Sequence, residues 1–518
     1  MTATFPDDGE PLSQQPRKSR SRKPAQPEKQ DDTVESKQEP SADRSTQADL
    51  LVELASDVEL FHDSDSKAYA SFESRGHCET SSIDSAHFSN WLAHRYYQAH
   101  GRAVSLNAMG TALEQLKAAA VFDGRTMLVH LRVAMEGDNM WLDLADSDWQ
   151  AIKITKKGWF LDANHAVKFI RKQGMQPLPV PEQSRDGDLD KMFRLFHVNE
   201  RGEQLLLTAW LVNVLNVSSS YPILVLIGEQ GSGKTTLARA LLRLVDPSYM
   251  ETRSPPRSEE DIAVAAQHGR IISYENMSAI TQSISDALCR VATGSAFGAR
   301  KLYSNEDERQ LKFCRPLLLN GIGDLATRSD LADRCITLRR PPIAAEQRQT
   351  EKQLWDEFER LRPKVLGELL DLAVAVHAMP DLDIPLERMA EFTLIGAKVA
   401  VAMELPASSF LDAYVANRGS ASLVALEASA VGSALRRRLT KGTLHCTMAE
   451  LLEELRREST PAERRNASWP DNPRSLSSEL DRLSPNLRRV GVHIGPKTHT
   501  RTGNMVQITL RSDVDDVH

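Results

Sequence analysis

The residues best suited to chemistry lie in a glycine-rich segment near the middle of the chain. Gly228 begins an eight-residue pattern, G-x-x-x-x-G-K-T, that ends with Gly233, Lys234 and Thr235. Glycines in such a loop let successive backbone N–H groups point at a phosphate chain, and a following helix N-terminus adds partial positive charge. The lysine of this pattern reaches the β- and γ-phosphates, and the hydroxyl group after it binds Mg²⁺. The segment therefore predicts a nucleoside triphosphate site made of Gly228, Glu229, Gln230, Gly231, Ser232, Gly233, Lys234, Thr235 and Thr236.

Such a loop needs a strand before it and a helix after it, and the sequence supplies both. Residues 223–227 are a short apolar run, and residues 237–245 have the character of a helix. Three further apolar runs follow at intervals that leave room for helices, at residues 270–275, 316–320 and 335–338. This order predicts a three-layer α/β core around a largely parallel sheet.

Polar residues stand at the ends of these runs. The carboxyl ends of parallel strands form the ligand-binding edge of such a sheet, so Lys234, Glu275 and Asn320 are expected to converge there. Glu275 fits the acid that binds Mg²⁺ or orients the attacking water, and Asn320 could orient water near the γ-phosphate. Arg334 precedes the last run and is expected to reach the nucleotide of a neighbouring subunit as an arginine finger.

Composition limits the class of protein. The 518 residues suffice for two to four domains, and 41% hydrophobic and 26% charged residues are ordinary values for a soluble chain. A net charge of −7 argues against a general nucleic-acid coat but not against local basic faces. Five scattered cysteines without a C-x-x-C pair favour reduced thiols and no zinc site. No apolar run approaches the ~20 residues of a membrane span, and no signal peptide is evident, so we expect a cytoplasmic protein with no membrane contact.

Changes in composition along the chain predict the domain order. The N-terminal segment is too poor in apolar residues to fold and carries a basic run at residues 17–23 that could touch nucleic acid, although most such runs are only solvated tails. The expected parts are a disordered tail (1–48), an α+β domain (49–172), a proline-rich linker (173–190), a P-loop ATPase core (191–345), a helical lid or collar (346–424) and a winged-helix-like domain (425–511).

The C-terminal part combines helix-like segments with a basic hairpin. Residues 447–455 and 475–483 are typical of helices, and residues 490–494 and 505–510 of strands. This order suggests a winged helix that binds duplex DNA. The alternative is a structural helical cap with a solvated basic face. The expected phosphate contacts are Arg474, Arg482, Arg488, Arg489, Lys497 and Arg501.

Two segments resemble motifs of a known family. Residues 288–303, with their TG…AR-LY pattern, and residues 315–321 resemble motifs B′ and C of superfamily 3 helicases, particularly those of phage and plasmid replication. The order of the loop, the Glu275 strand, this pattern and the Asn320 strand is the order found there, and residues 333–335 look like the arginine-finger turn of that AAA+ branch. The whole chain also resembles ATP-binding proteins encoded beside primase-polymerases in bacterial integrated elements.

The resemblance implies a function and its partners. It suggests an ATP- and Mg²⁺-dependent DNA helicase or translocase of a mobile-element or phage-type replication system. The implied assembly is a homo-hexamer or other ring, with Arg300, Lys301 and Tyr303 gripping single-stranded DNA in its pore. A primase-polymerase is a further implied partner.

Asn276 departs from the family pattern, because a second acid after Glu275, or Asp-Asn, would be more usual. This departure leaves nucleotide binding secure but bears on the rate of hydrolysis. Two alternatives therefore stay open. One is an AAA+ switch or loader that acts on DNA without unwinding it, and the other is a DNA-binding regulator with weak hydrolysis.

Overall fold

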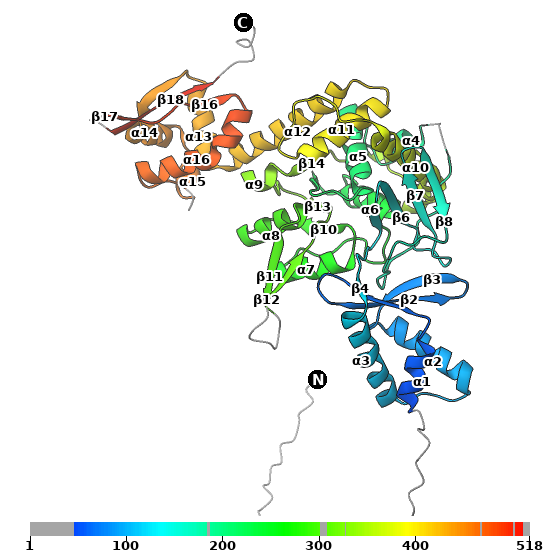
Figure 1. Ribbon diagram of the computed structural model, residues 1–518. Helices are drawn as coiled ribbons and strands as arrows, with labels where there is room; N and C mark the ends of the chain where they lie inside the picture. Colours follow the sequence, from blue (N-terminus) through cyan, green and yellow to red (C-terminus); the bar gives the residue numbers. More distant parts are fainter. Residues whose placement is uncertain are drawn as a thin grey trace, which may run out of the picture. The chain divides into compact units, whose positions relative to one another are not determined.

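A computed structural model describes residues 46–183, 187–300, 308–326, 328–466, 469–500 and 503–510. Nearly all of the tail predicted to be disordered therefore lies outside the described residues. The predicted mixed α/β class is confirmed: helices and several separate sheets alternate along the chain (Figure 1). Among the described residues, no helix is long and apolar enough to cross a membrane.

The central sheet has four parallel strands. They are β9 (Ile223–Gly228), β10 (Ile272–Met277), β13 (Leu317–Gly321) and β14 (Cys335–Arg340), in the order β10-β13-β9-β14. Each lies within two residues of a run that the sequence predicts as a strand. Strand β9 is buried along almost its whole length, which is why its sequence is a continuous apolar run.

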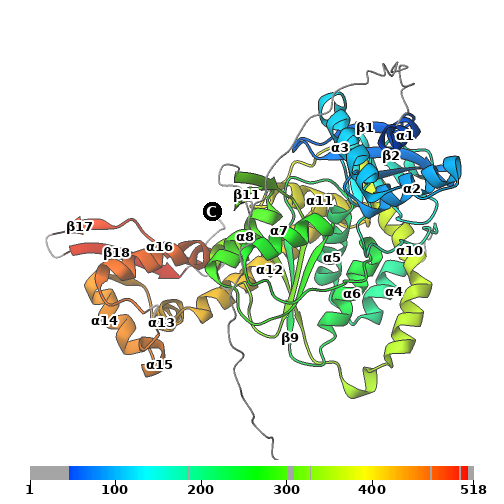
Figure 2. The ribbon, with the colours of Figure 1, turned by 90° about the horizontal axis from the view of Figure 1, so that it is seen from below.

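Helices cover both faces of this sheet. Alternate residues of β9 belong to different hydrophobic clusters, because successive side chains of a strand point to opposite faces. Ile223 and Val225 pack with α7 (Glu259–His268) and α8 (Gln282–Ala292). Leu224 and Leu226 pack with α5 (Arg201–Val214) and α6 (Lys234–Val245). Figure 2 shows these two helix pairs on either side of β9.

The N-terminal part contains two sheets. The first has the order β3-β2-β1-β4 and packs with three helices into a cluster of its own. Its elements are α1 (Gln47–Leu54), β1 (Glu59–His62), β2 (Ala68–Ser74), β3 (His77–Ser82), α2 (Ala86–His100), α3 (Leu106–Phe122) and β4 (Arg125–Thr126).

The second sheet is antiparallel and belongs to a different core. Its strands are β5 (Val133–Glu136), β6 (Asn139–Asp143), β7 (Ala151–Thr155) and β8 (Gly158–Asp162). Leu142 and Ile152 of this sheet share a hydrophobic cluster with α5 and α6 of the central sheet. The cluster therefore crosses the domain boundary that the sequence predicts at residue 172.

The proline-rich segment after residue 172 contacts the folded parts of the chain at several points. The Leu178 backbone N–H donates to Leu144 O at 2.8 Å, and the Glu182 N–H donates to Pro363 O at 3.0 Å. A Cβ on Gly367 would lie 1.9 Å from Glu182 O, so the segment runs directly against the helix that carries Gly367.

Helices dominate the region that follows the central sheet and the short segment that precedes it. They are α4 (Asp188–Leu195), η1 (Ala345–Gln347), α10 (Glu351–Ala378), α11 (Ala390–Ala402) and α12 (Ala407–Ala428). Helix α10 is continuous through Pro363, although a proline inside a helix removes one backbone hydrogen bond.

Two smaller elements connect the strands of the central sheet. A hairpin of β11 (Ala296–Arg300) and β12 (Glu308–Lys312) follows α8, with Ala296 paired to Lys312 and Arg300 to Glu308. The short helix α9 (Ser329–Ala332) precedes β14.

The C-terminal part has its own core. Its sheet has the order β15-β18-β16, with β17 also pairing with β18. Its elements are α13 (Ala430–Leu439), β15 (Leu444–Thr447), α14 (Met448–Glu458), α15 (Pro461–Arg464), α16 (Pro473–Arg489), β16 (Val492–Ile494), β17 (Thr498–Thr500) and β18 (Gly503–Leu510). Leucines of α14 and α16 fill the space between helices and sheet.

Candidate nucleotide site

The glycine-rich loop joins the carboxyl end of β9 to the first residue of α6. A Cβ on Gly228 would lie 2.4 Å from Arg340 O and 2.8 Å from Ser232 Oγ, so only glycine fits there. Gly231 and Gly233 have φ angles of +76° and +71°, which other residues rarely adopt. The glycines of the pattern are therefore required by the path of the backbone.

This loop has hydrogen-bond donors without acceptors. Among the described residues, the backbone N–H groups of Gly231, Ser232 and Gly233 donate to no other group. The Ser232 hydroxyl is buried and likewise has no partner among the described residues. These groups lie at the N-terminus of the twelve-residue helix α6, whose dipole favours an anion. Buried polar groups are normally paired, so the loop fits a bound phosphate chain.

Lys234 lies inside the same loop. Its Nζ donates to the carbonyl oxygen of Glu229 at 3.0 Å. Burial lowers the pKa of Lys234, because the charged ammonium loses contact with water. An anionic phosphate in the loop would offer this ammonium a stronger acceptor than a carbonyl oxygen does.

The ends of β10 and β13 meet beside this loop. Asn320 pairs in register with Leu226 of β9, and its Oδ1 accepts from the Asn276 backbone N–H at 3.2 Å. Asn276 has a left-handed φ of +55°, and the register of β10 shifts between Tyr274 and Met277. The Asn320 side chain is fully buried, and its Nδ2 has no partner among the described residues. The Asn320 Oδ1 thus holds the end of β10, while its Nδ2 has a donor available for a ligand or a water molecule.

The oxygen donors around the loop fit a magnesium ion. The Thr235 hydroxyl and the half-buried Glu275 carboxylate are the hard oxygen ligands that Mg²⁺ prefers. The part of the chain that the structure describes holds no group of three or more His, Cys, Asp or Glu side chains able to bind a metal. Mg²⁺ in nucleotide sites is usually held by one or two protein oxygens together with substrate phosphates and water, so this sparse donor set suits it.

Arg334 lies at the opposite end of the sheet. Its carbonyl oxygen accepts from the Ile223 N–H at 2.8 Å, which places Arg334 beside the first residue of β9. The strand rise puts Ile223 roughly 17 Å from Gly228. The Arg334 guanidinium donates to Asp330 O at 2.6 Å. The structure therefore brings Lys234, Glu275 and Asn320 to one edge and separates Arg334 from them.

Of the residues predicted to grip DNA, the structure describes Arg300 alone, on the β11–β12 hairpin. Arg300 is the last residue of β11. Lys301 and Tyr303 lie outside the described residues.

The chain matches two models of one protein family. Residues 189–421 match the model described as "Actinomycete integrative conjugative element replication protein", and residues 428–515 match that of the "AICE RepA C-terminal domain". Together the two matches cover more than half of the chain. The chain belongs to this family. Its role in replication is thereby confirmed, as is the predicted likeness to proteins of bacterial integrated elements.

Solved structures offer weaker likenesses to this replication protein. "The A form apo structure of NrS-1 C terminal region-CTR" has a TM-score of 0.40 and 10% identity, covering 89% of this chain and 98% of that one. "The X-ray structure of JCV Helicase" has a TM-score of 0.20 and 17% identity, covering 42% and 71%. At such TM-scores neither likeness supports an argument about this chain. Among curated proteins, no match is found.

A second cation lies near the loop, and the sequence does not predict it. The Ile343 N–H donates to Gly231 O at 3.1 Å, so the segment after β14 closes against the loop. Arg348 follows in this segment, and its Nη2 lies 3.9 Å from the position that a Cβ on Gly231 would take. Arg340 is also near but is buried, and it donates to Phe196 O at 2.8 Å. No local pattern marks Arg348, because its position depends on how the chain turns after β14.

Proposed function

We propose that this replication protein is an ATP hydrolase that translocates on DNA as the helicase of its element. The observation that carries the proposal is the loop between β9 and α6. Its glycine conformations, unpaired N–H groups and buried Lys234 together fit a triphosphate. A P-loop ATPase core of this type would take ATP as substrate and Mg²⁺ as its metal.

Each residue at the carboxyl edge of the sheet has a role in the proposed mechanism. The loop N–H groups and Lys234 hold the phosphates and stabilise charge that develops on them. When bound through Thr235 and Glu275, Mg²⁺ would neutralise phosphate charge. The free Asn320 amide orients the attacking water, and the Glu275 carboxylate accepts its proton or stays on the metal.

The position of Arg334 is the reason for proposing a ring. A guanidinium at the amino end of β9 is too far from the loop of its own chain to contact that nucleotide. It can stabilise the transition state only if a neighbouring copy brings its loop close. We therefore propose a hexamer or other ring of identical subunits, with single-stranded DNA held by the β11–β12 hairpins in its pore.

The C-terminal part would bind duplex DNA as a winged helix, with α16 as the recognition helix. The ion pairs revise the expected phosphate contacts. Arg482 pairs with Glu479 at 2.6 Å and Lys497 pairs with Asp481 at 2.7 Å, so both charges are partly neutralised. Arg501 lies outside the described residues. Exposed arginines that make no ion pair among the described residues are Arg457, Arg464, Arg465, Arg474 and Arg488.

Four of these arginines come from the end of α14, from α15 and from the first turn of α16. We therefore place the proposed phosphate contacts at the N-terminal end of α16 rather than on the hairpin. The proposal also keeps a primase-polymerase as a partner at the replication fork, on the strength of the family resemblance.

One observation favours a second candidate, an AAA+ switch or loader. Asn276 stands where many ATPases carry a second acid, and its backbone N–H is engaged by Asn320. Without that second acid, hydrolysis could be slow enough to time a change of state rather than to drive unwinding.

One pair of assays separates the two candidates. ATP turnover is measured with and without single-stranded DNA, and unwinding is measured on a forked duplex. A helicase shows DNA-stimulated turnover together with strand displacement, whereas a switch or loader shows stimulation without displacement. Turnover that is absent under both conditions would refute the ATPase itself.

A further inference from the structure

The residue next to the proposed finger is a buried acid with two arginine partners. Asp333 is 4% exposed and directly precedes Arg334. Its Oδ2 accepts from Arg388 Nη1 at 3.0 Å, and its Oδ1 accepts from Arg489 Nη1. A buried carboxylate is strongly held by such partners, and removing one of them leaves its charge poorly compensated.

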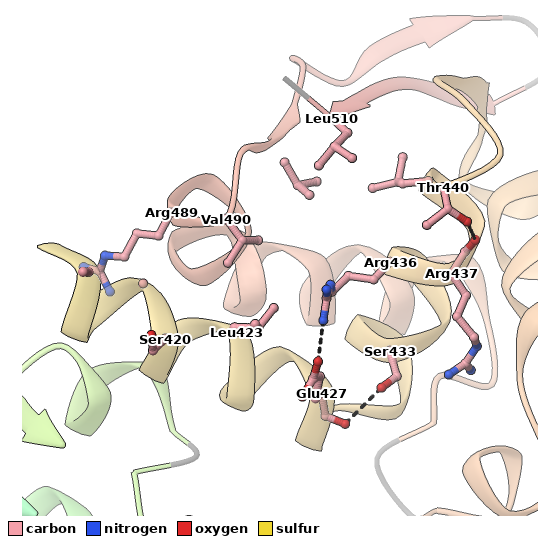
Figure 3. Close-up of a pocket in the computed structure, with 14 residues that line it drawn as sticks. Ser420, Leu423, Glu427, Ser433, Arg436, Arg437, Thr440, Arg489, Val490 and Leu510 are labelled. Atoms are coloured by element: carbon pink, nitrogen blue, oxygen red, sulfur yellow. Dashed lines mark hydrogen bonds and ion pairs between the residues drawn. The ribbon is translucent and has the colours of Figure 1, made fainter. Parts of the chain in front are cut away.

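The two arginines come from different parts of the chain. Arg388 lies just before α11, in the helical region that packs on the central sheet. Arg489 is the last residue of α16, in the C-terminal part, 156 positions from Asp333. In Figure 3 the Arg489 side chain extends away from the Arg436–Glu427 pair of the neighbouring groove. Asp333 therefore receives one contact from the ATPase core and one from the C-terminal part.

Helix α16 links this contact to the proposed DNA surface. It has 17 residues and is thus about 25 Å long. Arg474 lies in its first turn, among the exposed arginines, and Arg489 ends it. A force applied to one end of a packed helix moves the other end.

The packing between α12 and the C-terminal part leaves room for such a movement. A groove of about 790 Å³ lies beside α12 and is lined by residues of α12, α13, α16 and β18, such as Leu423, Val490 and Leu510 (Figure 3). Ser429 is the single residue between α12 and α13. The Arg489–Asp333 pair lies at the edge of this groove, close to where α16 packs against α12 and α9.

We propose that Asp333 and Arg489 are positioning residues that transmit duplex binding by the C-terminal part to Arg334. The turn that carries Arg334 is held by backbone hydrogen bonds and by one side-chain bond: the Arg334 N–H donates to Leu331 O, its carbonyl oxygen accepts from Ile223, and its guanidinium donates to Asp330 O. The Asp333 carboxylate holds this turn in place, and a movement of α16 would alter its contact with Arg489. This inference rests on the proposed function, because it requires Arg334 to act on a nucleotide.

The test compares two variants of the full-length protein that each remove one partner of Asp333. Arg489→Ala removes the arginine of the C-terminal part, and Arg388→Ala is the matched control that removes the arginine of the core. ATP turnover is measured with no DNA and with a mixed-sequence linear duplex, alongside nucleotide affinity and melting temperature. Arg489→Lys tests rescue, since a single donor suffices for the observed contact.

We expect both alanine variants to lower kcat on the order of tenfold while KM stays nearly unchanged. Duplex DNA should stimulate the wild type and Arg388→Ala but not Arg489→Ala, and Arg489→Lys should recover part of the response. Equal stimulation of Arg489→Ala and the wild type would overturn the coupling. A purely structural role would lower the melting temperature and affect both alanine variants alike.

Hydrogen exchange makes the test independent of turnover. Adding the duplex should change amide exchange across residues 329–335 in the wild type, and Arg489→Ala should abolish that change. An unchanged exchange pattern in the wild type overturns the coupling even if the ATPase is active. Conversely, an active ATPase in Arg334→Ala, or no turnover in the wild type, would overturn the proposed function and leave the exchange result to decide whether α16 reaches this turn.

Discussion

The two ends of the central sheet are built in different ways. Most of the polar groups at its carboxyl edge come from one short stretch of the chain. The groups around Arg334, at the amino end, come from segments that are far apart in the sequence. The loop from Gly228 to Lys234 assembles its donors by local backbone geometry. Arg334 instead adjoins a carboxylate held by Arg388 and Arg489, which lie 55 and 156 positions away from it.

This difference shows what each end needs in order to work. In the proposed function, the loop binds a nucleotide within one chain, because its donors and its lysine are already in place. Arg334 would act on the loop of another copy, and its neighbour Asp333 contacts the C-terminal part. Binding should therefore survive changes at the amino end, while hydrolysis should depend on both ends.

The largest effect is expected at the loop. Lys234→Ala should lower ATP turnover at least about 10³-fold, because it removes the cation that meets the β- and γ-phosphates. The measurement is steady-state phosphate release by the purified variant. Its melting temperature should stay close to that of the wild type, since the Lys234 ammonium makes one hydrogen bond among the described residues, to a carbonyl of its own loop. Wild-type turnover in a folded variant would contradict the nucleotide site.

Arg334→Ala should separate hydrolysis from binding. We expect turnover to fall on the order of 10³-fold with nearly normal ATP affinity, because the guanidinium lies far from the loop of its own chain. Mixing this variant with Lys234→Ala should restore part of the activity, since a mixed interface can pair an intact lysine with an intact arginine. A strictly monomeric enzyme that remains active would refute both the finger and the ring.

The carboxyl edge was predictable from sequence for a physical reason. Strands buried on both faces have continuous apolar sequences, and the glycine pattern is imposed by backbone conformation, so both leave local signals. The sequence also predicts which polar residues end β10 and β13. It could not predict that Asn320 accepts from Asn276, because that bond depends on the shift in register.

Other features depend on packing between distant segments. The sequence predicts an α+β domain over residues 49–172 but not that strands β5 to β8 share a core with α5 and α6. Strand β15 has only four residues, too few for a reliable pattern. The Lys497–Asp481 and Arg489–Asp333 pairs join residues 16 and 156 positions apart, and charge alone does not tell a paired cation from a free one. These pairs are why the basic surface predicted from composition differs from the one that the structure favours.

A smaller effect is expected at Asn320. Asn320→Asp keeps the oxygen that accepts from Asn276 but replaces the unpaired amide donor with a negative charge. Turnover should fall about 10²-fold, as for the loss of one transition-state donor, with a smaller change in ATP affinity. Single-turnover rates and nucleotide titrations check this expectation. A loss of ATP affinity with an unchanged single-turnover rate would show that Asn320 only supports binding.

The proposed DNA surface offers a comparison between free and paired cations. Replacing Arg465 and Arg474 by alanine should weaken duplex binding about tenfold. The slope of the logarithm of the binding constant against the logarithm of the salt concentration should fall by about one for each phosphate that is no longer neutralised. Lys497→Ala is the matched control, because Asp481 already neutralises that charge. Titrations at several salt concentrations give both quantities. If Lys497→Ala had the larger effect, the hairpin rather than the start of α16 would bind the phosphates.

The smallest effect is expected at Arg348, the cation that lies beside the loop of its own chain. Its guanidinium is exposed, so water and salt screen its attraction for a phosphate, and such interactions are worth at most about 1 kcal/mol. Arg348→Ala should therefore raise the Kd for ATP about two- to fivefold at low salt, with little change at high salt and nearly unchanged kcat. Arg339→Ala is a suitable control, because Arg339 lies near the carboxyl end of β14 but pairs with Asp324 at 2.8 Å. A loss of turnover comparable to that of Arg334→Ala would mean that a cation of the same chain serves the transition state, and the distinction between the two ends of the sheet would fail.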